Sequence, residues 1–272
     1  TRRRTGARRA SRKVVSGMNA HSTPAQGGNL PKERTDLAAA YRLIAHFGMD
    51  DSIYTHISAK APGGELFLLN SYGQRFTEVK ASELVTVDLD GTVIDDPLGH
   101  GINAAGFTIH SAVHAARPDV GCVLHTHTVA GVAVSCLEEG LLPLNQWALQ
   151  FHDRIAYHAF EGMALNLEER QRLQADLGNA KAMVLRNHGL MTCGRTVGEA
   201  FVLMHNLERA CQAQLAAQAT GRPLRLPSPE IAELTARQYE TWDALHASSG
   251  LDDPEWDAFL RLTRDVAPDF ES

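Results

Sequence analysis

The chain has 272 residues, 44% of them hydrophobic and 21% charged, which is long enough for one domain with a sizeable core plus appendages. The first 17 residues carry seven basic side chains and no acidic one, which leaves 19 of the 26 basic side chains against all 32 acidic ones in the rest of the chain. Because the remainder is acidic and no apolar run approaches the roughly 18–20 residues that cross a bilayer, we expect neither nucleic acid nor membrane as a partner.

Residues 1–31 are predicted to form a disordered basic tail. Residues 1–17 are rich in Arg, and residues 19–31 combine Ser, Pro, Gln and paired Gly, a composition typical of linkers. Met18 is a candidate true start, in which case the residues before it are translated upstream sequence. A transit peptide and an anion-binding arm are the alternatives. The ordered chain is expected to begin near Lys32.

The first half of the ordered chain is predicted to contain a helix, several short strands and a second helix. Apolar residues recur at helical spacing from Leu37 to Phe47, and Gly48 is a natural stop. Apolar and β-branched runs predict strands at 54–59, 66–69, 84–87 and 92–94. A helix over 107–116 places His110 and His114 one turn apart on one face.

The second half is predicted to open with a strand over 120–129, because this β-branched stretch follows a Pro-Asp turn. Strand or loop segments are expected at 141–148 and 155–160, and a helix at 167–177. Thr196 and Glu199 fit a capping box that opens a long helix to about Ala217. The Ser-Pro and Asp-Pro pairs at 228–229 and 253–254 are typical helix starts, which predicts a helical extension over residues 223–272.

Three histidines have a spacing that a metal ion can use. Side chains alternate along a strand, so His125 and His127 are expected on the same face. His188 follows an apolar run at 182–185 and precedes Gly189, which permits a sharp turn, so its ring can project from a strand end toward the pair. Three neutral imidazoles that leave open positions are typical of a catalytic metal site. The alternative is a packed or solvent-facing pair, because 13 histidines produce such spacings by chance.

Six short motifs occur in order along the chain: AGFTIH at 105–110, AARPDV at 115–120, HTH at 125–127, GLLP at 140–143, AYH at 156–158 and LRNHGL at 185–190. They resemble the class II aldolase/adducin family, and most of all its adducin-type bacterial branch, from about residue 33 to about residue 220. The resemblance implies an α/β fold, a three-layer α/β/α domain around a mostly antiparallel central sheet, over residues 32–222. It also implies a homo-oligomer, usually a tetramer with active sites at subunit interfaces.

The resemblance places the family's three metal ligands on His125, His127 and His188. The expected cofactor is therefore a divalent metal, with zinc preferred over manganese or iron. The family's recurrent histidine beside the metal pocket corresponds to His110, which is the candidate catalytic residue.

The chain departs from the sugar-phosphate aldolases of that family where they bind phosphate. Their Gly-Asn pair and the Ser that follows correspond here to Thr55, His56 and Ser58, and their Thr-Gly pair corresponds to Tyr72 and Gly73. The glycine that lets a backbone approach a phosphate is thus absent at Thr55. By position, His56, Ser58, Tyr72 and Gly73 are the candidate substrate-binding residues.

A second departure concerns acid–base groups. The acidic residue that acts as catalytic base in those aldolases is replaced by Gly106, and the nearest counterpart of their proton-donating tyrosine is Phe160. We therefore predict a metal-dependent lyase, aldolase-like or a decarboxylase, that acts on a small oxygenated acid through an enediolate or enolate and not on a sugar phosphate. Decarboxylation has less need of the missing base.

Two other functions stay open at this point. A non-haem iron oxygenase could use the same three histidines, although the usual facial triad contains a carboxylate. A binding module like the adducin head would keep the fold without catalysis. The cysteines lack C-x-x-C spacing and are expected to be reduced thiols of a cytoplasmic protein: Cys122, Cys136, Cys193 and Cys211.

Overall fold

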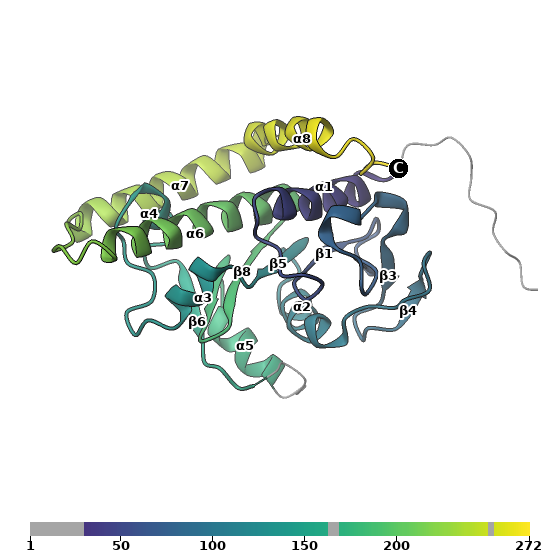
Figure 1. The fold of residues 1–272 in the computed structure, drawn as a ribbon, viewed down its shortest axis with the longest axis horizontal. Coiled ribbons are helices and arrows are strands. Elements are labelled where there is room, and N and C mark those ends of the chain that lie inside the picture. Colours follow the sequence, from purple (N-terminus) through teal and green to yellow (C-terminus); the bar gives the residue numbers. More distant parts are fainter. Residues whose placement is uncertain (1–29, 163–168, 250–252) are drawn as a thin grey trace, which may run out of the picture.

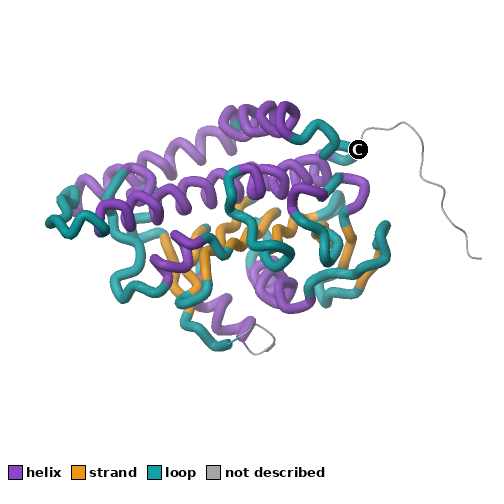
Figure 2. The backbone as a smooth tube through the Cα atoms, viewed as in Figure 1, coloured by secondary structure: helices purple, strands orange, loops and turns teal. Residues whose placement is uncertain are grey.

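A computed structural model describes residues 30–162, 169–249 and 253–272 (Figures 1 and 2). The predicted basic tail, including Met18, therefore lies outside the described residues except for its last two positions. Within those ranges, helices cover both faces of one eight-stranded sheet. None of the described helices is both long and apolar enough to span a membrane.

The sheet has the strand order β4-β3-β2-β1-β5-β8-β7-β6. Every neighbouring pair is antiparallel except β6 and β7, which are parallel, so the mostly antiparallel sheet expected from the sequence is confirmed. The strands are β1 (His56–Lys60), β2 (Phe67–Leu69), β3 (Val85–Val87), β4 (Val93–Asp95), β5 (Cys122–Thr126), β6 (Ile155–His158), β7 (Ala182–Leu185) and β8 (Gly189–Gly194).

The helices form layers on the two faces of the sheet (Figure 1). One face is covered by α1 (Lys32–His46) and α6 (Val197–Gln218), and the other by α2 (Ala104–Ala116) and α5 (Glu169–Leu177). The C-terminal α7 (Pro229–Ser249) and α8 (Pro254–Val266) lie outside α1 and α6, as the predicted extension. Shorter helices occur in the connections: α3 (Val129–Ser135), α4 (Gln146–Leu149), and two 3₁₀ turns at Phe76–Glu78 and Ala81–Glu83.

Alternation along β5 sends its side chains into two separate cores. Cys122 and Leu124 pack with the helices of the α1–α6 face, whereas Val123 packs with residues of α2 and α5. His125 is two residues beyond Val123 and therefore shares its face. The pairing of β1 with β5 sets His56 opposite His125, so His56 lies on the same face. The face toward α2 thus receives the histidines of the sheet.

The structure corrects three elements of the sequence prediction. The strand expected over 120–129 ends at Thr126, because the hydroxyl of Thr128 accepts the backbone N–H of Gly131 and caps α3. The segment 141–148, expected as strand or loop, is a connection only as far as Asn145; its last three residues belong to α4, which Asn145 caps in the same way. Strand β8 was not predicted, because its sequence GLMTCG begins and ends in glycine and has one β-branched residue.

The C-terminal extension is fixed to the domain by its last residues. Arg42 of α1 forms an ion pair with Asp269 at 3.1 Å, and the backbone N–H of Ala81 donates to the carbonyl of Phe270 at 2.9 Å. Phe270 is fully buried. The end of the chain therefore packs beside the first helix, where Figure 1 marks the C-terminus.

Candidate metal centre

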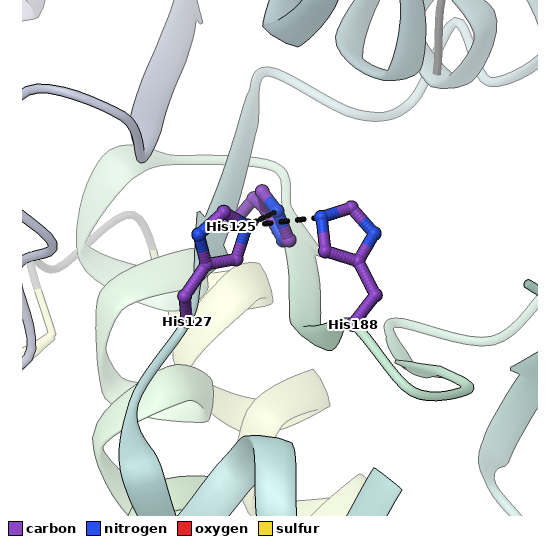
Figure 3. A group of neighbouring side chains, drawn as sticks. All are labelled: His125, His127 and His188. Carbon is purple, nitrogen blue, oxygen red and sulfur yellow. Dashed lines mark hydrogen bonds between the residues drawn. The ribbon is translucent and has the colours of Figure 1, made fainter. Parts of the chain in front are cut away.

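Three imidazoles converge at the end of β5 (Figure 3). His125 is the next-to-last residue of β5, and His127 is the first residue after that strand. His188 lies between β7 and β8. The Nε2 atom of His127 is 2.8 Å from that of His125 and 2.9 Å from that of His188. The prediction that these three side chains meet is therefore confirmed, although His127 stands just beyond the strand.

Close backbone packing brings His188 to the pair. Asn187 adopts a left-handed conformation with φ +57°, which turns the chain between β7 and β8. A Cβ on Gly189 would lie 2.3 Å from the carbonyl oxygen of Thr126. The expectation that Gly189 makes this turn is wrong, because Asn187 makes it. Gly189 is needed for a different reason, namely the close approach of β8 to β5.

Hydrogen bonds at the outer nitrogens fix the tautomers of two rings. Nδ1 of His125 is 2.9 Å from the carbonyl oxygen of Leu190, and Nδ1 of His127 is 3.0 Å from Oδ2 of Asp51. Both oxygens can only accept, so each Nδ1 carries the hydrogen and each Nε2 presents a lone pair. Two acceptor nitrogens that face each other at 2.8 Å cannot share a hydrogen bond. A cation between them would remove the repulsion of the two lone pairs.

Burial disfavours a protonated ring at two of the three positions. Burial holds the pKa of His125 well below its ordinary value and lowers the pKa of His188 to about 4. At neutral pH both rings are therefore neutral, which is the form that binds metals. The ligand atoms of the three histidines all lie within 4.8 Å of one another, an arrangement that fits a divalent cation.

Asp51 is a further candidate site residue, which could not be recognised from the sequence. It lies in the connection between α1 and β1 and is half-exposed, at 46% for its side chain. A carboxylate that accepts the second ring N–H of a metal-binding histidine orients the ring and makes it a stronger ligand. No local pattern marked Asp51, because its partner His127 is 76 residues away in the chain.

Behind His125, a row of polar side chains runs through the buried space between β1 and α2. Nδ1 of His56 is 2.7 Å from Nε2 of His110, Nδ1 of His110 is 2.6 Å from Oγ of Ser58, and that Oγ is 2.8 Å from Nε2 of His114. All four residues are buried, His110 and Ser58 completely. Burial lowers the pKa of His56 and of His114 to about 3, so both rings are neutral at physiological pH.

Gly106 provides the space that the ring of His56 occupies. A Cβ built on Gly106, in the first turn of α2, would lie 2.0 Å from Nε2 of His56 and 2.1 Å from its Cδ2. Two heavy atoms that are not bonded to each other cannot approach this closely, so a side chain at position 106 would displace the ring. The ring centroids of His56 and His125 are 5.4 Å apart, so His56 lies beside the three-histidine cluster.

The remaining predicted site residues do not all lie beside the three histidines. Ser58 and His110 lie behind His56 within the buried row, and His110 has no exposed surface. Tyr72 and Gly73 form a turn after β2, in which Tyr72 is 44% exposed and Gly73 has φ +88°. Phe160, which is also exposed, has its ring centroid 6.3 Å from that of His188. His56 is thus the candidate substrate-binding residue that lies nearest to the three histidines by its ring contacts.

Known proteins are similar to this chain in sequence and in fold. A model of the class II aldolase and adducin N-terminal domain matches residues 35–215. A Pseudomonas aeruginosa protein named for aldolase class 2 is 56% identical over 192 residues, which cover 70% of this chain and 73% of that protein. Alpha-adducin of Mus musculus is 46% identical over 185 residues, which cover 67% of this chain but 25% of the adducin.

Solved structures agree with the sequence matches. An aldolase II superfamily protein from Pseudomonas syringae superimposes with a TM-score of 0.82 at 45% identity, and the match covers 90% of this chain and 97% of that one. An L-fuculose 1-phosphate aldolase from Glaciozyma antarctica has a TM-score of 0.75 at 27% identity, with 88% and 92% of the two chains covered. The chain therefore belongs to the class II aldolase/adducin family.

Proposed function

We propose that this protein is a divalent-metal-dependent lyase that acts on a small oxygenated acid. The observation that carries the proposal is the convergence of His125, His127 and His188, in which the Nε2 atoms of His125 and His127 face each other at 2.8 Å, an arrangement that a cation between them would stabilise. A bound divalent ion supplies Lewis-acid stabilisation of the negative charge that develops on substrate oxygens when a carbon–carbon bond breaks. Zinc suits three neutral imidazoles best, with manganese or iron as alternatives.

The residues of the chain have separate roles in this proposal. His125, His127 and His188 hold the ion, while Asp51 and the carbonyl of Leu190 keep two of these rings in the tautomer that binds it. The substrate enters on the open side of the cluster, and His56, beside His125, is the neighbouring polar group. His110 is fully buried and reaches a substrate only through His56, so we assign it a positioning role.

The substrate class follows from what surrounds the ion. Gly106 offers no acid, and Ser58 is turned into the buried row toward His110 and His114. A phosphorylated sugar would therefore lack both a base and part of a phosphate cradle. A carboxylic acid with a second oxygen on the neighbouring carbon can instead bind through two oxygens. If such an acid also carries a carboxylate β to a carbonyl, loss of carbon dioxide leaves an enolate, and no base has to remove a proton in that step.

The comparison with an L-fuculose 1-phosphate aldolase at 27% identity supports carbon–carbon lyase chemistry, and the similarity to alpha-adducin supports the alternative of a non-enzymatic binding module. An iron oxygenase remains the third candidate. We also propose that the protein is a cytoplasmic homotetramer with interfacial sites, as the family resemblance implies.

One experiment separates these functions. Protein purified without added metal is analysed for bound elements and then incubated with 2-hydroxy, 2-oxo and 3-oxo acids, with carbon dioxide, aldehyde and oxygen consumption measured. Release of carbon dioxide or aldehyde that stops on chelation supports the lyase. Bound iron with oxygen uptake supports the oxygenase, and a metal-free protein without turnover supports the binding module.

A further inference from the structure

The ring of His56 occupies the space that a side chain at Gly106 would fill. Nε2 of His56 lies where the first atom of any side chain at position 106 would be, at 2.0 Å from the built Cβ. Gly106 stands in the first turn of α2, a position without positive φ, where the helix itself does not require glycine. The glycine is therefore explained by the space that the imidazole needs.

The buried row behind His56 can exist in two neutral arrangements. A neutral imidazole has one N–H and one acceptor nitrogen, and a hydroxyl can donate one hydrogen bond and accept another. If His114 donates to Ser58, Ser58 to His110, and His110 to Nδ1 of His56, then Nε2 of His56 carries a hydrogen. If all three bonds run in the opposite direction, Nε2 of His56 presents a lone pair. Neither arrangement puts a charge in the buried space.

We propose that His56 replaces the acidic side chain of the sugar-phosphate aldolases at Gly106, and that its Nε2 contacts the metal-bound substrate as a hydrogen-bonding group. His110 and Ser58 are positioning residues, which hold the ring and decide whether Nε2 donates or accepts. This inference rests on the proposed metal-dependent function. It adds a catalytic residue that touches the substrate.

A neutral imidazole in place of a carboxylate changes which substrate charge the site favours. A carboxylate at position 106 would bring negative charge close to the ion, whereas the imidazole of His56 brings none. Three neutral imidazoles and a divalent ion then favour a ligand that supplies its own negative charge. The proposal therefore predicts a chelating carboxylate as substrate, and oxalate is a simple probe of this chemistry.

The first arm of the test measures stability and needs no substrate. Gly106→Ala should lower the melting temperature of the otherwise unchanged protein, because its Cβ collides with the ring of His56. In a His56→Ala background, the same substitution should leave the melting temperature unchanged or raise it, since alanine favours a helix over glycine. An equal drop in melting temperature in both backgrounds would refute the claim that the ring of His56 takes the place of a side chain at position 106.

The second arm measures oxalate binding to the zinc-loaded protein by calorimetry. His56→Ala should weaken binding by roughly 10- to 100-fold, the effect of losing a hydrogen bond to a charged group. His110→Ala should weaken it too, but should add nothing in the His56→Ala background, because it acts through that ring. His110→Gln, which can keep one hydrogen bond to His56, should lose less.

His205→Ala is the matched control for loss of a buried histidine, because that ring packs against Phe47, Phe201 and Phe259 and belongs to neither the cluster nor the row. It should bind oxalate as the wild type does. If the wild type takes up zinc and binds oxalate while His56→Ala binds it equally well, the role of His56 is refuted and the metal-dependent function stands. If the wild type binds neither zinc nor oxalate, the proposed function fails together with this inference.

Discussion

The carboxylate of Asp51 accepts a hydrogen bond from Nδ1 of His127 at 3.0 Å and thereby points the other nitrogen of that ring at His125 and His188. It links the connection before β1 to the cluster after β5, two segments that are far apart in the chain. Outer carboxylates of this kind typically change metal affinity by 10- to 100-fold when they are removed.

We therefore predict that Asp51→Ala lowers zinc affinity by roughly 10- to 100-fold, whereas Asp51→Asn, whose amide oxygen can still accept, lowers it less. Competition with a chromogenic chelator measures the change. Asp50→Asn, at the exposed neighbouring position, is the control and should bind zinc as the wild type does. Unchanged affinity in Asp51→Ala would show that His127 is oriented without the carboxylate.

A second prediction concerns substrates. A general base typically contributes a factor of about 10² to 10⁴, and none stands at Gly106, so we expect negligible turnover of fuculose, rhamnulose and ribulose phosphates. A coupled assay for the aldehyde product measures this turnover, with a chelating carboxylic acid as the comparison substrate. Robust metal-dependent cleavage of any of these phosphates would contradict the proposed substrate class.

A third prediction concerns stability at acid pH. His205 packs among Phe47, Phe201 and Phe259, and burial lowers its pKa to about 4 from the ordinary 6.5. The unfolded chain then binds a proton at this residue between about pH 6.5 and 4 that the folded chain does not. The stabilisation from a neutral ring is thus complete above pH 6.5 and is lost as pH falls toward 4.

Removal of this histidine should therefore flatten the pH dependence. Urea unfolding of the wild type at pH 7 and pH 5 should give a larger loss of stability than the same measurement on His205→Leu, which keeps an apolar side chain of similar size. A loss as large in the variant as in the wild type would mean that other groups account for the acid sensitivity.

A fourth prediction concerns assembly. Two exposed apolar side chains adjoin the cluster: Val129, two residues after His127, is 88% exposed, and Phe160, close to His188, is 54% exposed. A second copy of the chain would bury them, as the proposed homotetramer requires. Light scattering should give about four times the chain mass of 29.6 kDa. A monomeric mass at full activity would contradict the proposal of interfacial sites.

Short-range rules made the histidine cluster a candidate from the sequence. Alternation along β5 orients His125, and a turn at a strand end exposes His188. Spacing alone left a packed or solvent-facing pair as the alternative, and the family resemblance placed the ligands on these three residues. The family resemblance supplied the layered fold and the mostly antiparallel sheet.

The partners of the cluster could not be predicted, because they depend on contacts between distant segments. Asp51 has no motif of its own, and its role exists only where the connection before β1 meets His127. The sequence presented His56 and Gly106 as two separate departures from the aldolases. Only the packing of α2 on β1 shows that one makes room for the other. Strand β8 was missed for a related reason, since its pairing with β5 and β7, and not its own propensity, makes it a strand.

The central claim is that His125, His127 and His188 together hold one divalent ion, and metal content tests it most directly. Elemental analysis of the wild type purified without added metal should find about one ion per chain. His125→Ala, His127→Ala and His188→Ala should each lose most of it while circular dichroism shows a folded protein, and the exposed His100→Ala should retain it. Full metal content in all three variants, or a metal-free wild type that takes up no zinc when it is supplied, would contradict the account.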